Sequence, residues 1–214
     1  MVDTNFGVTS LFTTPLMEVE LSLDTDKLTE FVFDMWNKDK DGKEKSNRGG
    51  WHSNNEIHKH PHEELQKLKK EITHYLRKYH LEVFRDMIFT SEMTQVIDEM
   101  WANINEKHDY NEWHVHPYSN LSGAYYVKHD GSKENGDILF KHPDPFYAKG
   151  YGMLHWPPQS VEAYNEVSAP IVEVTPKTNL LLLFPSWLEH KVNNNLKNDT
   201  RISFSFNTTL LKIN

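Results

Sequence analysis

The chain has 214 residues, no cysteine and a formal net charge of −8. The acidic excess argues against nucleic acid or an anionic membrane as the main partner, and the lack of cysteine excludes disulfide bonds and thiolate metal sites. The length is typical of one domain, so we expect residues 1–214 to form a single domain in the cytoplasm, without a membrane span or a secretory signal.

The N-terminal part, residues 1–100, is expected to supply an extended lead-in and supporting helices. Residues 16–21 partly alternate between apolar and polar side chains, which predicts a strand at a sheet edge. Asp26 is a predicted N-cap for a helix whose apolar residues recur at helical spacing, namely Leu28, Phe31, Val32, Met35 and Trp36. Residues 83–100 are compatible with a helix followed by a strand.

Three histidines, His58, His60 and His62, look at first like a metal-binding tract. Pro61 and Glu63, however, are typical of a first helical turn, and the apolar residues behind them recur at the spacing of an amphipathic helix. We therefore interpret the three histidines as the solvated start of a helix.

From Trp101 onward, short apolar stretches alternate with segments rich in Gly, Pro and Asn. This pattern predicts an antiparallel sandwich or barrel within residues 101–210. The expected strands are Trp101–Asn105, Trp113–His116, Leu121–Lys128, Asp137–Phe140, Ile171–Val174, Leu180–Phe184 and Arg201–Thr208. The aromatic stretch 146–169 is long for a connection and is interpreted as a lid beside a site.

His114 and His116 are separated by one residue in a predicted strand, so their side chains should share one face. Two imidazoles on one face, joined by the distant His190, would suit Fe, Zn, Cu or Ni rather than Ca or Mg. The alternative is that the two histidines lie on a solvated or half-buried strand and bind nothing.

The last predicted strand has a polar face with Arg201, Ser203, Ser205 and Asn207, and an apolar face with Ile202, Phe204 and Phe206. Either the polar face lies in water, or it faces a barrel interior and presents Arg201 as a buried guanidinium that binds an anion. The strand alone does not decide between the two.

Together, these residues resemble the 2-oxoglutarate- and iron(II)-dependent oxygenases, which have a strand-borne HxD or HxE, a distal histidine and an arginine beyond it. The matching segments are His114-Val115-His116, His190 at the end of FPSWLEH, and Arg201 with Ser203. The sequences of three segments, Arg48–Ser53, Trp101–Asn103 and Ser122–Tyr126, are most similar to a branch of this superfamily found in bacteria and in phages of marine bacteria. If a phage encodes the chain, the expected compartment is the cytoplasm of its host.

The resemblance spans nearly the whole chain and implies a mainly β fold with N-terminal helices (α+β), in which a double-stranded β-helix of the jelly-roll or cupin type occupies residues 101–210. It implies Fe(II), 2-oxoglutarate and O2 as cofactors, and oxidative decarboxylation of 2-oxoglutarate coupled to hydroxylation of a substrate. His114, His116 and His190 would bind the metal, and Arg201 would bind the distal carboxylate of 2-oxoglutarate.

Further residues are assigned by the same resemblance. Tyr126 would place its hydroxyl on that carboxylate, and Ser122 and Ser203 would lie in the same pocket. The substrate side would be lined by aromatic and amide side chains, for which the candidates are Trp101, Asn103, Tyr151 and Trp156. No residue identifies the substrate, which would be a small molecule or a protein side chain.

His116 departs from the family pattern, because a carboxylate normally stands at this position. Three neutral imidazoles would leave the same open positions on the metal and one more positive charge. Glu112 has the same strand parity and is the alternative third ligand; an empty third position would instead point to halogenase-like chemistry or lost activity.

Two other functions remain open from the residues alone. The chain would be a metal-binding β-barrel that binds a ligand or partner without turning it over, or a Zn-dependent hydrolase or isomerase with three histidines and a water on the metal. The orientation of Arg201 separates these alternatives from the oxygenase, which needs the guanidinium to face the metal.

Overall fold

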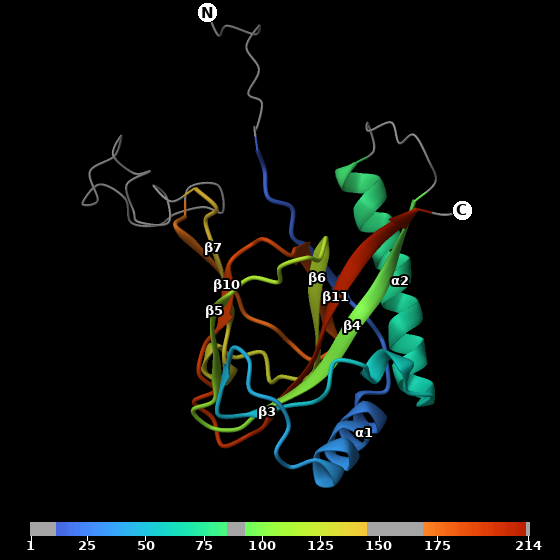
Figure 1. The fold of residues 1–214 in the computed structure, drawn as a ribbon. Coiled ribbons are helices and arrows are strands. Elements are labelled where there is room, and N and C mark those ends of the chain that lie inside the picture. The colour runs from blue at the N-terminus through green and yellow to red at the C-terminus, as the bar shows by residue number, and fades with distance from the viewer. Residues whose placement is uncertain (1–11, 85–92, 145–168, 213–214) are drawn as a thin grey trace, which may run out of the picture.

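The computed structural model describes residues 12–84, 93–144 and 169–212, and within them two antiparallel sheets face each other (Figure 1). The larger sheet has the order β1-β9-β6-β11-β4-β3 and the smaller one β2-β5-β10-β7-β8. In the larger sheet the strands are β1 (Met17–Glu20), β3 (Trp51–His52), β4 (Met93–Asn105), β6 (Leu121–Lys128), β9 (Leu180–Pro185) and β11 (Arg201–Lys212). In the smaller sheet they are β2 (Asn47–Arg48), β5 (Tyr110–His114), β7 (Ile138–Lys141), β8 (Ile171–Val174) and β10 (His190–Val192).

Two helices, α1 (Thr25–Lys38) and α2 (Glu63–Val83), pack on the outer face of the larger sheet (Figure 1). The N-cap of α1 is Asp24 rather than the predicted Asp26, and its carboxylate accepts a hydrogen bond from the Lys27 amide at 3.2 Å. The apolar residues at helical spacing do face inward, because Leu28, Phe31 and Val32 are buried. None of the helices in the described residues is both long and apolar enough to cross a membrane.

The prediction of N-terminal helices followed by an antiparallel sandwich or barrel is confirmed. Strands β6 and β8 have the predicted bounds, whereas β4 begins at Met93 and β11 continues to Lys212. Both strands are longer than predicted because they pair with each other along nearly their whole length, with one irregularity at Asn207. The short strands β2, β3 and β10 were not predicted, because a few residues carry no periodic signal.

The larger sheet separates the hydrophobic core beneath the helices from the space between the two sheets. Its outward side chains, among them Ile202, Phe204 and Phe206, are fully buried against the helices. The opposite, polar face of β11 lines an interior cavity of about 400 Å³. Of the two possibilities for the last strand, the structure therefore has the one in which Arg201 faces inward.

Candidate metal and cosubstrate site

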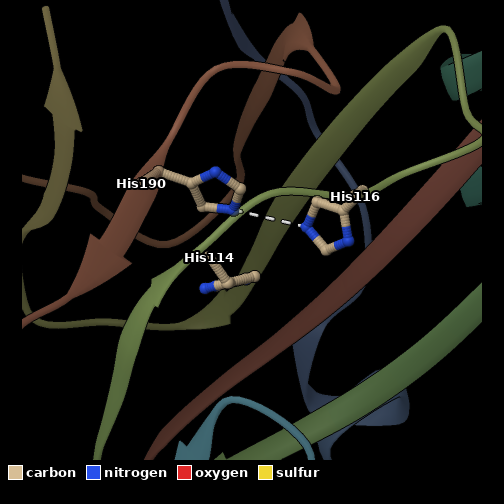
Figure 2. A group of neighbouring side chains, drawn as sticks. All are labelled: His114, His116 and His190. Atoms are coloured by element: carbon tan, nitrogen blue, oxygen red, sulfur yellow. Dashed lines mark hydrogen bonds between the residues drawn. The ribbon is translucent and has the colours of Figure 1, made fainter. Parts of the chain in front are cut away.

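Three histidines converge on one point between the sheets (Figure 2). His114 ends β5 and His190 begins β10, and the two residues lie directly opposite each other in the ladder. His116 follows the end of β5, so the predicted strand Trp113–His116 begins three residues too late and ends two residues too late. The backbone N–H of His116 donates to Ser186 O at 2.9 Å instead. One ligand nitrogen from each ring lies within 4.8 Å of the others, and His116 Nε2 is 3.3 Å from His190 Nε2.

Backbone carbonyls fix the tautomers of two of these rings. His114 Nδ1 lies 2.7 Å from Glu112 O, and His190 Nδ1 lies 2.8 Å from Leu188 O. A carbonyl oxygen can only accept, so both Nδ1 atoms carry the proton and both Nε2 atoms keep a lone pair. The Nε2 atom of His190 lies 3.3 Å from His116 Nε2, and that of His114 lies 3.5 Å from Ser46 Oγ. This is the arrangement in which histidine binds a divalent transition metal.

Burial keeps the three imidazoles neutral. It lowers the pKa of His114, lowers the pKa of His116 to about 4, and lowers the pKa of His190 well below its usual range. Removal from water disfavours the charged form, and for His116 and His190 the neighbouring rings of the cluster add to the effect. Neutral rings keep their lone pairs available to a metal near pH 7.

The carboxylate of Glu112 turns away from the cluster. It accepts from Arg48 Nη2 at 3.1 Å, and its side chain is about half exposed. In the described part of the chain, His114, His116 and His190 form the single group of three metal-ligating side chains close enough to share an ion.

We expect His116→Ala to weaken metal binding by at least about tenfold, since changes even to groups that merely orient metal ligands cost about 10- to 100-fold. Glu112→Gln should leave the affinity unchanged, because its carboxylate is engaged by Arg48. Titration of both variants with Fe(II) or Co(II) measures this. The reverse pattern would transfer the third position to Glu112.

Arg201 is buried, and only one of its two terminal nitrogens has hydrogen-bond partners in the described residues. Its Nη1 donates to the backbone oxygens of Asn135, Gly136 and Asn193 at 2.9, 3.2 and 3.2 Å. Its Nη2 is buried and has no hydrogen-bond partner within the described residues, and the side chain lines the cavity. Burial lowers the pKa of Arg201 to about 10, which still leaves the group protonated at pH 7. A buried charged donor without a partner fits an anionic ligand.

Gly136 makes the position of Arg201 possible. Its backbone has φ +100°, a conformation that favours glycine, and a Cβ atom there would collide with Arg201 Nη1 and lie 2.6 Å from Asn193 O. The guanidinium therefore rests against a bare backbone, which explains physically why a glycine belongs at this turn.

Comparison with known proteins identifies the family. A family model described as "Putative 2OG-Fe(II) oxygenase" matches residues 99–207, about half of the chain. The chain belongs to this family of 2-oxoglutarate- and iron(II)-dependent oxygenases. Membership implies Fe(II) and 2-oxoglutarate as its cofactors. No curated protein sequence matches the chain.

Solved structures show that the oxygenase has the double-stranded β-helix fold. A prolyl-4-hydroxylase from Pseudomonas putida is 14% identical, with a TM-score of 0.57, 92% of this chain covered and 93% of that one. HygX from Streptomyces hygroscopicus, solved with nickel and 2-oxoglutarate bound, is 11% identical, with a TM-score of 0.55 and coverage of 92% and 83%. SnoN, an α-ketoglutarate-dependent epimerase from nogalamycin biosynthesis, is 13% identical, with a TM-score of 0.55 and coverage of 91% and 77%.

Of the other residues predicted to bind 2-oxoglutarate, Tyr126 and Ser203 line the cavity and Ser122 does not. Ser203 lies opposite Tyr126 in the ladder, and both line the oxygenase cavity with Arg201. Burial raises the pKa of Tyr126, so its hydroxyl stays protonated and able to donate. Ser122 is not among the cavity-lining residues, because its hydroxyl is hydrogen-bonded to Ser186 Oγ at 2.9 Å and to Asn207 Oδ1 at 2.8 Å.

Of the residues predicted to contact the substrate, Trp101 and Asn103 both line the cavity of the oxygenase. The Trp101 ring stacks on His52, with centroids 5.3 Å apart and planes at 10°, and lies 5.7 Å from the His116 ring. Tyr151 and Trp156, like nearly all of the predicted lid, lie outside the described residues.

Several polar residues of the cavity were not singled out by sequence reasoning, among them His52, Asn55 and Glu99. For Glu99 a signal was available, because it has the same strand parity as Trp101 and Asn103. It was overlooked because the predicted strand began only at Trp101.

The early histidines lie apart from the described side chains that are close enough together to share an ion, and their predicted solvation is wrong for His58. His58 is buried, since the short 3₁₀ turn η1 (Ile57–Lys59) packs against β4 and carries it inward. The rings of His60 and His62 lie 4.8 and 4.6 Å from the Phe31 ring.

Replacing His58, His60 and His62 together by Gln should leave the metal content of the oxygenase unchanged. Stability should fall by about 1 to 2 kcal/mol, because a buried ring and two packed rings are lost. Elemental analysis and thermal unfolding of the triple variant measure both quantities. A loss of bound metal without unfolding would contradict the assignment of the site to the other three histidines.

Proposed function

We propose that the protein couples oxidative decarboxylation of 2-oxoglutarate to hydroxylation of a second substrate. The reaction would convert 2-oxoglutarate, O2 and a substrate C–H bond into succinate, CO2 and an alcohol, with one oxygen atom entering each organic product. The observation that carries the proposal is the presence, in one cavity, of three converging imidazoles and a buried guanidinium whose Nη2 has no partner among the described residues.

In this proposal His114, His116 and His190 hold Fe(II) through one nitrogen each. The donor set fits, because the carbonyls that accept from Nδ1 leave the Nε2 lone pairs of two rings free. The bound iron supplies the activation of O2. Three neutral ligands leave both positive charges on the ion, which favours the dianionic cosubstrate more than a carboxylate-containing triad would.

Arg201 is proposed to bind the C5 carboxylate of 2-oxoglutarate through Nη2, while its Nη1 stays bonded to the three backbone oxygens. The protonated hydroxyl of Tyr126 and that of Ser203 would complete the carboxylate site. These groups orient the cosubstrate and replace its hydration shell. Hydroxylation is the proposed outcome, and a prolyl-4-hydroxylase is among the structures with this fold.

The test is succinate and CO2 formation by the Fe(II)-loaded protein, with and without O2, in the absence of a primary substrate. We expect slow turnover of 2-oxoglutarate that requires both Fe(II) and O2. A protein that binds iron but neither binds nor consumes 2-oxoglutarate would instead be a non-catalytic metal-binding barrel. Zn-supported hydrolysis without O2 would favour the hydrolase alternative.

A further inference from the structure

The cavity has opposite charges at its two ends. Strands β4 and β11 present paired residues to the cavity. At one end Asn105 lies opposite Arg201, and at the other end Glu99 lies opposite Asn207. Six residues of strand separate Asn105 from Glu99, or about 20 Å at about 3.4 Å per residue. Arg201 therefore marks a cationic end and Glu99 an anionic end of the same cavity.

The Glu99 carboxylate is fixed by two amides. Its Oε1 accepts from Asn55 Nδ2 and its Oε2 from Asn207 Nδ2, both at 3.0 Å. The Asn207 amide is itself oriented, because its Oδ1 accepts from the Ser122 hydroxyl at 2.8 Å. Two N–H donors stabilise the ionised carboxylate, so Glu99 presents a full negative charge to the cavity.

Glu99 forms no direct ion pair in the described residues. The hydrogen bond from Asn55 lowers the pKa of Glu99 the most, and the charge of the exposed Lys45 lowers it further. Lys45 also lines the cavity but forms no contact with the carboxylate within 4.0 Å. The nearby Asn55 Oδ1 is buried and has no hydrogen-bond partner in the same part of the chain. This end of the cavity thus has acceptors in excess, and a ligand with several N–H donors would satisfy them.

An aromatic ring stands next to the carboxylate. Trp101 follows Glu99 on the same face of β4, lines the cavity and is held by its stack on His52. A tryptophan face attracts cations, and the effect grows when the cation is removed from water. The Trp101 ring also lies 5.7 Å from the His116 ring, so this anionic end adjoins the histidine cluster.

We propose that Glu99, Asn55 and Trp101 form a subsite for a cationic group of the primary substrate, an ammonium or a guanidinium. The inference rests on the proposed function, in which 2-oxoglutarate occupies the Arg201 end. The anionic cosubstrate is repelled from Glu99 and a cationic substrate from Arg201, so the two ligands take opposite ends of the cavity. The histidine cluster adjoins this subsite, so the C–H bonds near the charged group would lie close to the metal that these histidines would hold.

The test uses three probes of similar size and different charge, which are 2-phenylethylamine, 2-phenylethanol and 3-phenylpropionate. Their dissociation constants are measured without O2 by ligand-observed NMR, on full-length protein loaded with Fe(II) and 2-oxoglutarate. We expect wild type to bind the amine about 10- to 100-fold more tightly than the alcohol, the range for a charge-assisted hydrogen bond, and the carboxylate most weakly. Amine binding that is undetectable, or no tighter than alcohol binding, overturns the inference.

Glu99→Gln should abolish this preference and bring amine and alcohol affinities within about twofold of each other. The variant is nearly isosteric, and the unpartnered Asn55 Oδ1 can turn to accept from the new amide. The matched control is Glu173→Gln on β8, which removes the same charge from an exposed pair with Lys133 and should keep the preference. A preference that survives in Glu99→Gln overturns the inference.

Iron content and 2-oxoglutarate affinity, measured in the same samples, separate the two proposals. Equal values in wild type and Glu99→Gln, together with a lost amine preference, support the subsite. Loss of iron in Glu99→Gln would assign the carboxylate to the metal site and overturn the subsite. A wild-type protein that binds neither iron nor 2-oxoglutarate would overturn the proposed function, and the inference with it.

Discussion

Replacing Arg201 by alanine is expected to weaken 2-oxoglutarate binding by about 30-fold to several thousandfold. Truncating one partner of a buried, hydrogen-bonded charge pair costs about 2 to 5 kcal/mol, and Arg201 is 1% exposed with its Nη2 unpartnered in the described chain. The measurement is titration of the metal-loaded variant with 2-oxoglutarate. Iron content should be largely retained, because Arg201 is not one of the side chains proposed to hold the metal.

Two further variants separate the charge of Arg201 from its placement. Arg201→Lys should recover part of the affinity, since an ammonium cannot bond three backbone oxygens and also form a planar fork with a carboxylate. Gly136→Ala keeps the guanidinium but pushes it from its backbone support, so affinity should fall although no charge is lost. Wild-type affinity in Arg201→Ala would remove the carboxylate-binding role and with it a principal support for the oxygenase mechanism.

His114→Ala and His190→Ala are each expected to remove most of the bound iron. One of three protein ligands is lost in either variant, and the binding energy of a metal depends on the full set of deprotonated donors. Elemental analysis after desalting measures the metal content, and turnover of 2-oxoglutarate should fall to background in both variants.

The control is His74→Ala, which removes an exposed imidazole on α2 and should keep wild-type iron content. Thermal unfolding should accompany the assay, because His190 is 3% exposed and its truncation leaves a cavity. Folded His114→Ala and His190→Ala proteins with undiminished iron would end the assignment of the histidine cluster as the metal site.

The fold class and most of the strands could be predicted from the pattern of residues along the chain. Alternation along Arg201–Thr208 separates an apolar face from a polar one, and the structure places these two faces on opposite sides of the sheet. Local periodicity suffices for this, since side chains of a strand alternate whatever the strand pairs with. The spacing of His114, His116 and His190 also indicated that these three side chains come together in one cluster.

Which polar atoms meet inside the sandwich depends on long-range packing and could not be predicted from the residue pattern. His116 lies beyond β5 yet reaches His190 at 3.3 Å, while Glu112, which shares the parity of His114, turns outward to Arg48. The position of a residue along a strand predicts which face of the sheet its side chain lies on. Where the strand ends, and which residue lies across the cavity, depend on segments distant in the chain.

The same reason applies to the residues that sequence analysis misplaced or missed. His58 is buried because a short turn packs on β4, and Glu99 enters the cavity because β4 extends eight residues before Trp101, as the bounds Met93–Asn105 show. Likewise, Arg201 Nη2 has no partner in the described segments, because the three backbone oxygens there engage Nη1 alone. Such hydrogen-bond partners are set by long-range packing, which a periodic pattern in one segment does not encode.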